Sequence, residues 1–421
     1  MGMTITEKIL ARASGRDRVC PGEIVETAVD LAMTQDILGA IAFPMFRELG
    51  IPVWDREKVV VVIDHCAPPS SLLNAGFVAE NIKFAEEFDI PHLYYGKGVC
   101  HQILPEEGFV KPGMTIVATD SHTTTHGALG AFATGIGSSE MVWVLARGQV
   151  WLRVPETIRV EISGKLGPLV TAKDVVLKLL SVFGTNGATY KTIEYGGEVV
   201  RRMSVDGRLT LCNMALETGA KNAIIEVDET TRSYLEDRVK GEIESLASDL
   251  DAQYLKVFPL DVSDLAPQVA CPYSPANVTA VADMAGKRVD QVLIGTCTGG
   301  RLEDFRMAAG LMKGRRVARR TRCLVIPASM RIYREMLDEG LMHVFADAGC
   351  VICNPHCGPC GGVQVGLLAD GEVCVGNHNR NFRGRMGSPK GEVYLTSTAT
   401  AAATAVAGEL VDPRVFRAEG G

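Results

Sequence analysis

The sequence predicts an α/β protein made of three α/β/α subdomains with largely parallel sheets. Short apolar runs such as the VVVVI of residues 59–63 have the composition of strands that are buried on both faces. Segments with helical periodicity alternate with these runs, and the 44 glycines suit many tight turns between strands and helices. Because 421 residues exceed one ordinary core, we expect subdomains at residues 1–155, 156–285 and 286–421.

The composition is that of an ordinary globular enzyme, with 47% hydrophobic and 22% charged residues. The net charge of −7 argues against a general nucleic-acid binder, and a solvated helix end or loop explains the basic segment at residues 313–322. No stretch reaches the roughly 18–20 apolar residues of a membrane span. Twelve cysteines without a recognisable signal peptide favour a reducing cytoplasm. We therefore expect neither a membrane nor a nucleic acid as partner.

In the first subdomain, polar residues follow the predicted strands. Residues 4–48 show helical periodicity with a break at the acidic GEIVE run near residue 22, and Gln35 and Asp36 stand where a helix should start. Predicted strands at residues 59–63, 92–95 and 115–119 are each followed closely by a histidine. Ligands bind at the carboxyl ends of parallel strands, and a carboxylate beside an imidazole sets a proton donor or acceptor near neutral pH. The candidates at these strand ends are Asp64, His65, His101, Asp120, Ser121 and His122.

The middle of the chain contributes fewer candidates. The glycine-rich run at residues 127–137 leads into GIGSSE and lacks a full GxGxxG, so close packing of a helix on a sheet explains it as well as a dinucleotide site does. The second subdomain begins with a predicted strand at residues 158–164 and a helix that Thr171 caps. Asn213 and Glu217 lie four residues apart and share one face of a predicted helix. Residues 225–265 are charged and fit a surface helix or an insertion.

The third subdomain is predicted to bring metal ligands and arginines to one edge of one sheet. Its predicted strands lie at residues 292–297, 323–328, 349–353 and 372–375. Cysteines and a polar segment follow these strands, and the carboxyl ends of parallel strands share one edge. The candidates there are Cys297, Cys357, Cys360, Asn379, Arg380 and Arg385.

Two ligand sets are open for the cysteine-rich loop at residues 350–360. The spacing CxxCx3CxxC offers a local four-cysteine site, either for zinc or for a closed iron–sulfur cluster. Alternatively, Cys357 and Cys360 join Cys297 and leave one metal position open, which would bind a substrate oxygen as a Lewis acid. In that case Cys350 and Cys353 are small hydrophobic residues at the end of a buried strand.

Seven motifs spread over nearly the whole chain are specific in combination. They are CHQ (100–102), TDSHTTTHGALGAFATGIG (119–137), ATYKTIEYGG (188–197), NMALETGA (213–220), IGTCTGGRLED (294–304), NPHCGPC (354–360) and NRNFRGRMG (379–387). With these motifs the chain resembles the aconitase superfamily of iron–sulfur hydro-lyases. Within it, the chain is most similar to the large subunits of 3-isopropylmalate dehydratase and homoaconitase.

The resemblance implies a fold around a central [4Fe–4S] cluster, held by Cys297, Cys357 and Cys360 with the fourth iron open to substrate. The implied reaction is the reversible dehydration and rehydration of a small hydroxy di- or tricarboxylic acid. The implied acid–imidazole pairs are Asp64–His65, Asp120–His101 and Glu217–His122, with His65 as candidate proton donor to the departing hydroxyl. Arg380 and Arg385 match arginines that bind substrate carboxylates. Gln35, Ser121, Asn213 and Asn379 match positions that contact substrate or cluster.

The resemblance also implies a partner. Single-chain aconitases carry a further swivelling domain with a serine base and another arginine, and this sequence ends at Gly421 without it. We therefore expect a separate small subunit that supplies the domain, and no competent catalysis without it. Isopropylmalate, homocitrate, citrate, methylmalate and dimethylmalate share the chemistry, and among them we favour 3-isopropylmalate.

Several positions depart from the family pattern. Gly299 stands where Asn is usual, His356 stands where Gly is usual, and Gly376-Asn377-His378 replaces the start of the usual TSNRNF. Gln35-Asp36 is more like true aconitases than like isopropylmalate enzymes. These changes raise the question of whether His356 or His378 touches the cluster. Two rival functions remain, namely an RNA-binding apo-form that uses residues 313–322 and a structural zinc site at residues 350–360.

Overall fold

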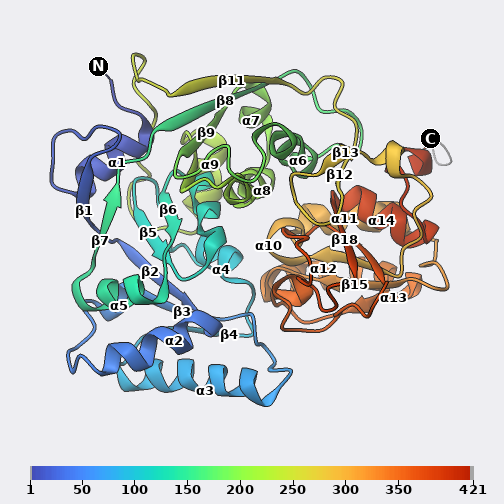
Figure 1. Cartoon of the computed structure of the whole chain (residues 1–421), viewed down its shortest axis with the longest axis horizontal. Coiled ribbons are helices and arrows are strands. Elements are labelled where there is room, and N and C mark those ends of the chain that lie inside the picture. The colour runs from blue at the N-terminus through green and yellow to red at the C-terminus, as the bar shows by residue number, and fades with distance from the viewer. Residues whose placement is uncertain (1, 418–421) are drawn as a thin grey trace. The chain divides into compact units, whose positions relative to one another are not determined.

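A computed structural model describes residues 2–417, which form two compact units (Figure 1). Unit 1 takes the described part of Met1–Tyr95, with Cys100–Ser163 and Asn186–Leu260. Unit 2 takes Gly96–Val99, Gly164–Thr185 and the described part of Asp261–Gly421. The three larger sheets follow one another along the chain as the predicted subdomains do, although strands at residues 268–280 join the third sheet. The three subdomain boundaries themselves stay a prediction.

A five-stranded parallel sheet in the order β4-β3-β2-β5-β6 forms the centre of unit 1. The chain runs from β2 outward to β4 and then returns to β5, so the strand order reverses between β2 and β5. In parallel sheets, such a reversal opens a crevice at the carboxyl ends of the two strands, where ligands bind. The strands are β2 (Leu31–Gln35), β3 (Val59–Ile63), β4 (His92–Tyr95), β5 (Thr115–Ala118) and β6 (Phe132–Gly135).

Three helices cover one face of this sheet, namely α2 (Asp36–Arg47), α3 (Leu72–Glu87) and α5 (Ser138–Arg147) (Figure 1). The rings of Phe43 and Phe84 stack with centroids 3.7 Å apart and join α2 to α3. As predicted, a helix begins directly after Gln35, whose side-chain oxygen accepts hydrogen bonds from the amides of Ile37 and Leu38.

The helical periodicity predicted for residues 4–48 is wrong in its middle part. Helix α1 (Ile5–Ala13) begins with a capping box between Thr4 and Glu7, but β1 (Ile24–Ala28) follows before β2. The residues of β1 are alternately exposed and buried, which is the period of a strand. Strand β1 pairs antiparallel with β7 (Gln149–Arg153) and forms a small separate sheet.

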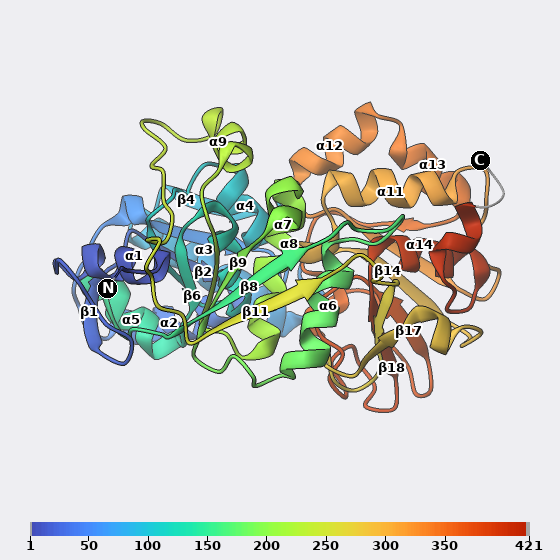
Figure 2. The same ribbon diagram turned by 90° about the horizontal axis from the view of Figure 1, so that it is seen from above.

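A second sheet of unit 1 has the order β10-β9-β8-β11 (Figure 2). Its strands are β8 (Thr157–Ser163), β9 (Thr192–Gly196), β10 (Asn222–Ile225) and β11 (Lys256–Asp261). A 3₁₀ segment, Ser121–Leu129, packs against β10 and against α8 (Val205–Ala215). A Cβ at Gly127 would lie 1.6 Å from the Ala223 carbonyl oxygen, so close packing explains this glycine. Of the charged stretch at residues 225–265, only the short α9 (Glu229–Glu236) and β11 are regular.

An ion pair between the buried Arg208 and the partly exposed Asp228 joins α8 to the start of α9. Arg208 is fully buried and forms two hydrogen bonds of 2.6 Å with the carboxylate of Asp228, which also caps α9. Replacing Asp228 with Asn keeps the cap but leaves the Arg208 charge without a counter-ion. We expect the free energy of unfolding to fall by about 3 kcal/mol, measured by denaturant titration at an unchanged m-value. Glu244→Gln, at the exposed Arg12–Glu244 pair, should cost less than about 1 kcal/mol.

Unit 2 is built on a seven-stranded mixed sheet in the order β13-β12-β18-β17-β14-β15-β16 (Figure 2). Here too the order reverses, between β14 and β17, so the carboxyl ends of these two strands border a crevice. The strands are β12 (Gln268–Ala270), β13 (Val278–Ala280), β14 (Gln291–Gly295), β15 (Arg322–Ile326), β16 (Val351–Ile352), β17 (Val373–Gly376) and β18 (Glu392–Thr396). The four strands predicted for the third subdomain are thus confirmed, with β16 shorter than expected.

The helices of unit 2 include the one predicted after Thr171, which begins with a capping box between Thr171 and Asp174. Among residues 2–417, no helix is both long enough and apolar enough to cross a bilayer. The helices of this unit are α6 (Ala172–Phe183), α10 (Thr296–Gly299), α11 (Leu302–Met312), α12 (Met330–Asp338), α13 (Leu341–Ala348) and α14 (Thr398–Ala407).

Candidate functional site

The crevice between β2 and β5 in unit 1 holds a group of imidazoles and carboxylates. Asp36 directly follows β2, Asp120 lies two residues beyond β5, and the amide of Gln35 donates to the Thr119 hydroxyl at 3.0 Å. His65 follows β3, and His101 lies in α4 (Cys100–Glu106). The strand order therefore brings to one edge residues that are far apart in the sequence.

His65 is surrounded by three carboxylates. Its Nδ1 lies 2.7 Å from Asp64 and 3.6 Å from Asp36, and its Nε2 lies 3.6 Å from Asp120. Burial disfavours the charged imidazole, but Asp64 and the other two carboxylates outweigh it and raise the pKa of His65 to about 10. His65 therefore stays protonated at neutral pH, as a proton donor must.

Asp120 connects the other two histidines. Its Oδ1 lies 2.7 Å from His101 Nε2 and accepts the backbone N–H of His122 at 2.8 Å. Burial favours the neutral acid, but the side chains of His101, His122 and His65 hold the pKa of Asp120 well below its usual range. The side chain of His122 turns to Glu217, with Nε2 and Oε1 2.8 Å apart. All three expected acid–imidazole pairs are thus in contact, and all six residues belong to unit 1.

The other candidates of unit 1 have structural contacts. Asn213 is fully buried in α8 and donates to the Thr125 hydroxyl at 2.8 Å, while Glu217 lies in the 3₁₀ turn that follows α8. Both residues contact the Ser121–Leu129 segment, although Glu217 lies beyond the end of the helix that was predicted to carry both. The Ser121 hydroxyl lies 3.4 Å from His122 Nδ1.

Sequence reasoning placed Asp36 at a helix start but did not assign it to the site. Asp36 is fully buried and accepts the backbone N–H groups of His65 and Cys66 at 3.1 and 2.6 Å, so it fixes the loop that carries His65. His126 was missed as well. Its ring lies 5.8 Å from that of His101, centroid to centroid, and is fully buried. The run HTTTH at residues 122–126, with two histidines four residues apart, was the available signal.

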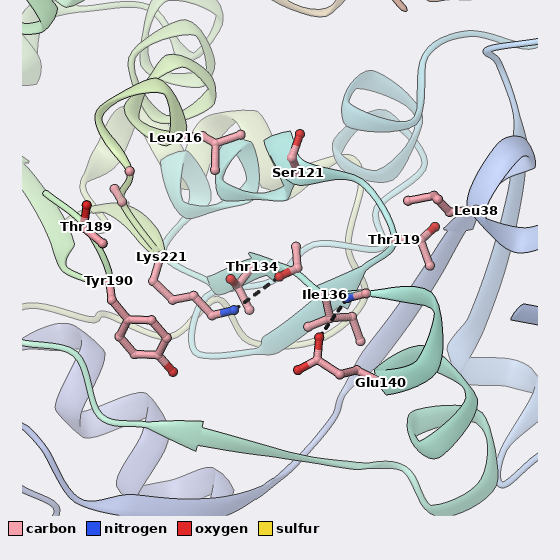
Figure 3. Close-up of a pocket in the computed structure, with 14 residues that line it drawn as sticks. Leu38, Thr119, Ser121, Thr134, Ile136, Glu140, Thr189, Tyr190, Leu216 and Lys221 are labelled. Carbon is pink, nitrogen blue, oxygen red and sulfur yellow. Dashed lines mark hydrogen bonds between the residues drawn. The ribbon is translucent and has the colours of Figure 1, made fainter. Parts of the chain in front are cut away.

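A cavity of about 460 Å³ adjoins this group of residues (Figure 3). Thr119 and Ser121, on either side of Asp120, belong to its lining. Lys221 donates to the Gly135 carbonyl at 3.3 Å, and Glu140 accepts the amide of Gly137 at 2.8 Å (Figure 3). The Glu140 carboxylate therefore occupies the start of α5, where a dinucleotide phosphate would have to bind. The glycine-rich run is thus better explained by packing than by a dinucleotide site.

The crevice between β14 and β17 in unit 2 holds cysteines. Cys297 lies in the short α10 directly after β14, and Asn379 Nδ2 donates to its sulfur at 3.3 Å. The pKa of Cys360 is held well below its usual range, mainly by a hydrogen bond from Cys357. Burial acts in the opposite direction, but Arg385 and the backbone N–H of Asn379 also lower this pKa. Asn379 thus contacts both Cys297 and Cys360, and Cys360 contacts Cys357.

The two outer cysteines of the loop have other contacts. Cys350 packs on the core of unit 2 and shares a hydrogen bond with the Cys323 thiol, which raises the pKa of Cys323. Cys353 is half-buried, and its sulfur lies 4.0 Å from the Val351 carbonyl oxygen. Strand β16 itself is an exposed edge and not the buried strand that we expected.

No compact zinc site is formed by these thiols in the described part of the chain. Zinc binds each thiolate at about 2.3 Å, which requires sulfurs within about 4.6 Å of one another. Among residues 2–417, the groups with three possible ligand atoms within 4.8 Å are His101, Asp120 and His122, and Asp36, Asp64 and His65. The contacts therefore favour the set with Cys297 over the local four-cysteine site.

The arginines of unit 2 have different surroundings. Arg385 donates from Nε to the Cys360 carbonyl at 2.6 Å, and Arg380 is half-buried next to Asn379. In the basic segment at residues 313–322, Arg322 makes two 2.6 Å hydrogen bonds with Glu372, and Arg315 donates to the Leu311 carbonyl. Part of that segment is therefore used within the fold, and no contact favours an RNA site.

Comparisons with known proteins agree with this geometry. The chain is 52% identical to a probable 3-isopropylmalate dehydratase large subunit of Methanothermobacter thermautotrophicus, over 98% of this chain and 99% of the relative. It is 52% identical to a 3-isopropylmalate dehydratase large subunit of Methanopyrus kandleri, over 99% and 100%. A probable methanogen homoaconitase large subunit of M. thermautotrophicus is 46% identical, over 98% of both chains.

One solved structure and one family model complete the comparison. The crystal structure of Thermococcus kodakaraensis aconitase X in its holo-form has a TM-score of 0.51 and 14% identity, over 98% of this chain and 95% of that one. At this identity the likeness shows the fold alone. The model of the aconitase family (aconitate hydratase) matches residues 7–287 and 282–408, nearly the whole chain. The chain belongs to the aconitase family.

Proposed function

We propose that the chain is the large subunit of a 3-isopropylmalate dehydratase, an iron–sulfur hydro-lyase. The observation that carries the proposal is the 52% identity, over nearly the full length, with two relatives of that name. The paired imidazoles and carboxylates at the end of the first sheet support it, because dehydration needs groups that give and take protons.

The proposed cofactor is a [4Fe–4S] cluster bound by Cys297, Cys357 and Cys360. Thiolates are the usual ligands of such clusters, and three of them for four irons leave one iron open. The donor set fits, because the pKa of Cys360 is held well below its usual range by its hydrogen bond with Cys357, and Asn379 directs N–H groups at two of the sulfurs. When bound, the cluster would supply a Lewis acid for the hydroxyl and one carboxylate of the substrate.

The residues of the chain would then perform the proton transfers and bind the substrate. His65, kept protonated by Asp64, is the proposed donor to the departing hydroxyl. His101 and His122, each held by a carboxylate, are proposed to complete the polar surface that binds the substrate hydroxyl and carboxylates. Arg380 and Arg385 are proposed to bind substrate carboxylates, with Arg385 oriented by its bond to the Cys360 carbonyl. Gln35, Ser121, Asn213 and Asn379 stay proposed contacts of the substrate or the cluster.

A small subunit is the proposed partner, as the words "large subunit" in the names of the relatives imply. We propose that it carries the swivelling domain with the serine base. The reducing cytoplasm is the proposed location, since the cluster ligands must stay thiols.

Homoaconitase is the second candidate function, because relatives of that name reach 46% and 45% identity. The deciding experiment is to measure kcat/KM of the anaerobically reconstituted chain, assembled with the small subunit from the same organism. We expect the highest value for 3-isopropylmalate and no turnover without the small subunit. A higher value for homoaconitate would assign the second function, and no turnover of any hydroxy acid or its dehydrated product would contradict both.

The pH dependence of the reaction should report the His65 pKa. Because this pKa is raised to about 10, the proton donor is in place at neutral pH and is lost only as the pH rises through about 10. Asp64→Asn removes the largest favourable charge, so the alkaline fall of kcat/KM, which reports groups of the free enzyme, should move to lower pH. The measurement is a pH profile of kcat/KM for both forms. An unchanged alkaline limb in Asp64→Asn would show that His65 is not the donor.

A further inference from the structure

The segment Gly376–Asn379 at the end of β17 departs from the family pattern and contains a histidine with no contact that explains it. His378 is fully buried, and neither of its ring nitrogens has a hydrogen-bond partner within residues 2–417. A neutral imidazole carries one donor and one acceptor, and leaving them unpaired in the interior costs on the order of 1–3 kcal/mol each. Such a residue persists where an ion or cofactor completes its bonding.

The neighbours of His378 are fixed around the cysteine crevice. The side-chain oxygen of Asn377 accepts a hydrogen bond from the Gly295 amide at 2.8 Å, and its Nδ2 donates to the Gly299 carbonyl at 2.9 Å. Asn377 therefore binds both ends of the turn that contains Cys297. On the other side, Asn379 donates to the Cys297 sulfur at 3.3 Å. His378 therefore lies between two residues that both bind the Cys297 turn.

Hydrogen bonds from a lysine also hold the backbone of this segment in place. Lys173 in α6 donates to the carbonyls of Asn377 and His378 at 3.1 and 2.6 Å. His378 thus belongs to a segment whose backbone is held in place, directly before Asn379, which contacts the proposed cluster ligand Cys297.

Two glycines make room for these side chains. A Cβ at Gly376 would lie 2.6 Å from His378 Nδ1, and a Cβ at Gly299 would lie 2.1 Å from Asn377 Nδ2. Any other residue at position 376 or 299 would displace the ring or the amide. Gly376 therefore makes room for the ring of His378, and Gly299 makes room for the side chain of Asn377.

We propose that His378 donates an N–H hydrogen bond to a sulfur of the iron–sulfur cluster held by Cys297, Cys357 and Cys360. It is a positioning residue for the cofactor and leaves the fourth iron open. The inference rests on the proposed function, because it requires that cluster. Hydrogen bonds to cluster sulfurs stabilise the reduced form, so His378 should also raise the reduction potential.

The test uses the full chain labelled with ¹⁵N-histidine, reconstituted anaerobically and reduced to its paramagnetic state. Pulsed EPR should then detect a weak ¹⁵N coupling that disappears in His378→Leu and persists in His343→Leu, where the histidine is exposed. The reduction potential should fall in His378→Leu and remain unchanged in His343→Leu. His378→Gln, which keeps an N–H donor, should restore part of the potential.

The outcomes separate this inference from the proposed function. If the wild-type chain forms no cluster, the proposed function fails. If the cluster forms but the ¹⁵N coupling is absent, or persists in His378→Leu, the proposal for His378 alone is overturned. A strong coupling would mean that the imidazole binds iron directly, which also overturns it. Should His378→Leu fail to fold, Gly376→Ala keeps the histidine but displaces its ring, and the coupling and the potential must then both decrease.

Discussion

Replacing Cys297 with Ser is expected to abolish the [4Fe–4S] cluster and the hydro-lyase activity together. Serine cannot replace the thiolate as an effective cluster ligand, and Cys357 and Cys360 alone do not hold a cubane with one open iron. The residue lies in α10, far in sequence from the other two, so its loss also tests whether β14 and the 350–360 loop share one metal site. The measurements are iron and sulfide content after anaerobic reconstitution, and turnover with the small subunit present.

The matched control is Cys353→Ser, in the same loop as Cys357 and Cys360. Cys353 is half-buried and its sulfur lies 4.0 Å from the Val351 carbonyl oxygen, so its replacement should leave iron content and turnover within about twofold of the wild type. If Cys353→Ser loses the metal and Cys297→Ser retains it, the local four-cysteine site is correct and the proposed function loses its cofactor.

The second large effect is expected for Asp120→Asn. This carboxylate lies 2.7 Å from His101 and 3.6 Å from His65, and it accepts the His122 amide. The amide keeps the shape but removes the charge that orients two imidazoles, so kcat should fall by about 10²–10⁴-fold. Cluster content should not change, because Asp120 belongs to unit 1 and the cysteines belong to unit 2.

Asp89→Asn serves as the control for Asp120→Asn, since Asp89 is an exposed residue in the left-handed region that asparagine tolerates. Its kcat should equal that of the wild type. A loss of less than about tenfold in Asp120→Asn, with the cluster intact, would show that the carboxylate is not part of the proton-transfer machinery.

The sequence predicted which acidic and imidazole side chains would meet better than it predicted the helices and strands around them. The strand-end positions of His65 and Asp120 could be read from apolar runs followed by polar residues, because parallel sheets place ligands at these ends. The contact between His122 and Glu217, 95 residues apart, was implied only by the family resemblance. Spacing along the chain does not show which carboxylate an imidazole will meet.

The misses have physical causes. Strand β1 was hidden because its five residues alternate in exposure, and so short a pattern is lost beside the helical periodicity of its neighbours. Asp36 was placed at a helix start but not in the site, since its bonds to the His65 and Cys66 amides depend on the pairing of β2 with β3. The packing of His378 over Gly376 likewise requires the folded turn, although both departures were visible in the sequence.

The central claim is that one iron of a cluster held by three cysteines is open to substrate. Mössbauer spectra of the ⁵⁷Fe-reconstituted chain, assembled with its small subunit, test this directly when recorded with and without 3-isopropylmalate. The account predicts a four-iron cluster in which one iron site changes its spectrum when the substrate is added and the other three do not. The account would be contradicted if the spectra of all four irons stayed unchanged when the substrate is added. It would also be contradicted if the chain bound zinc in place of iron.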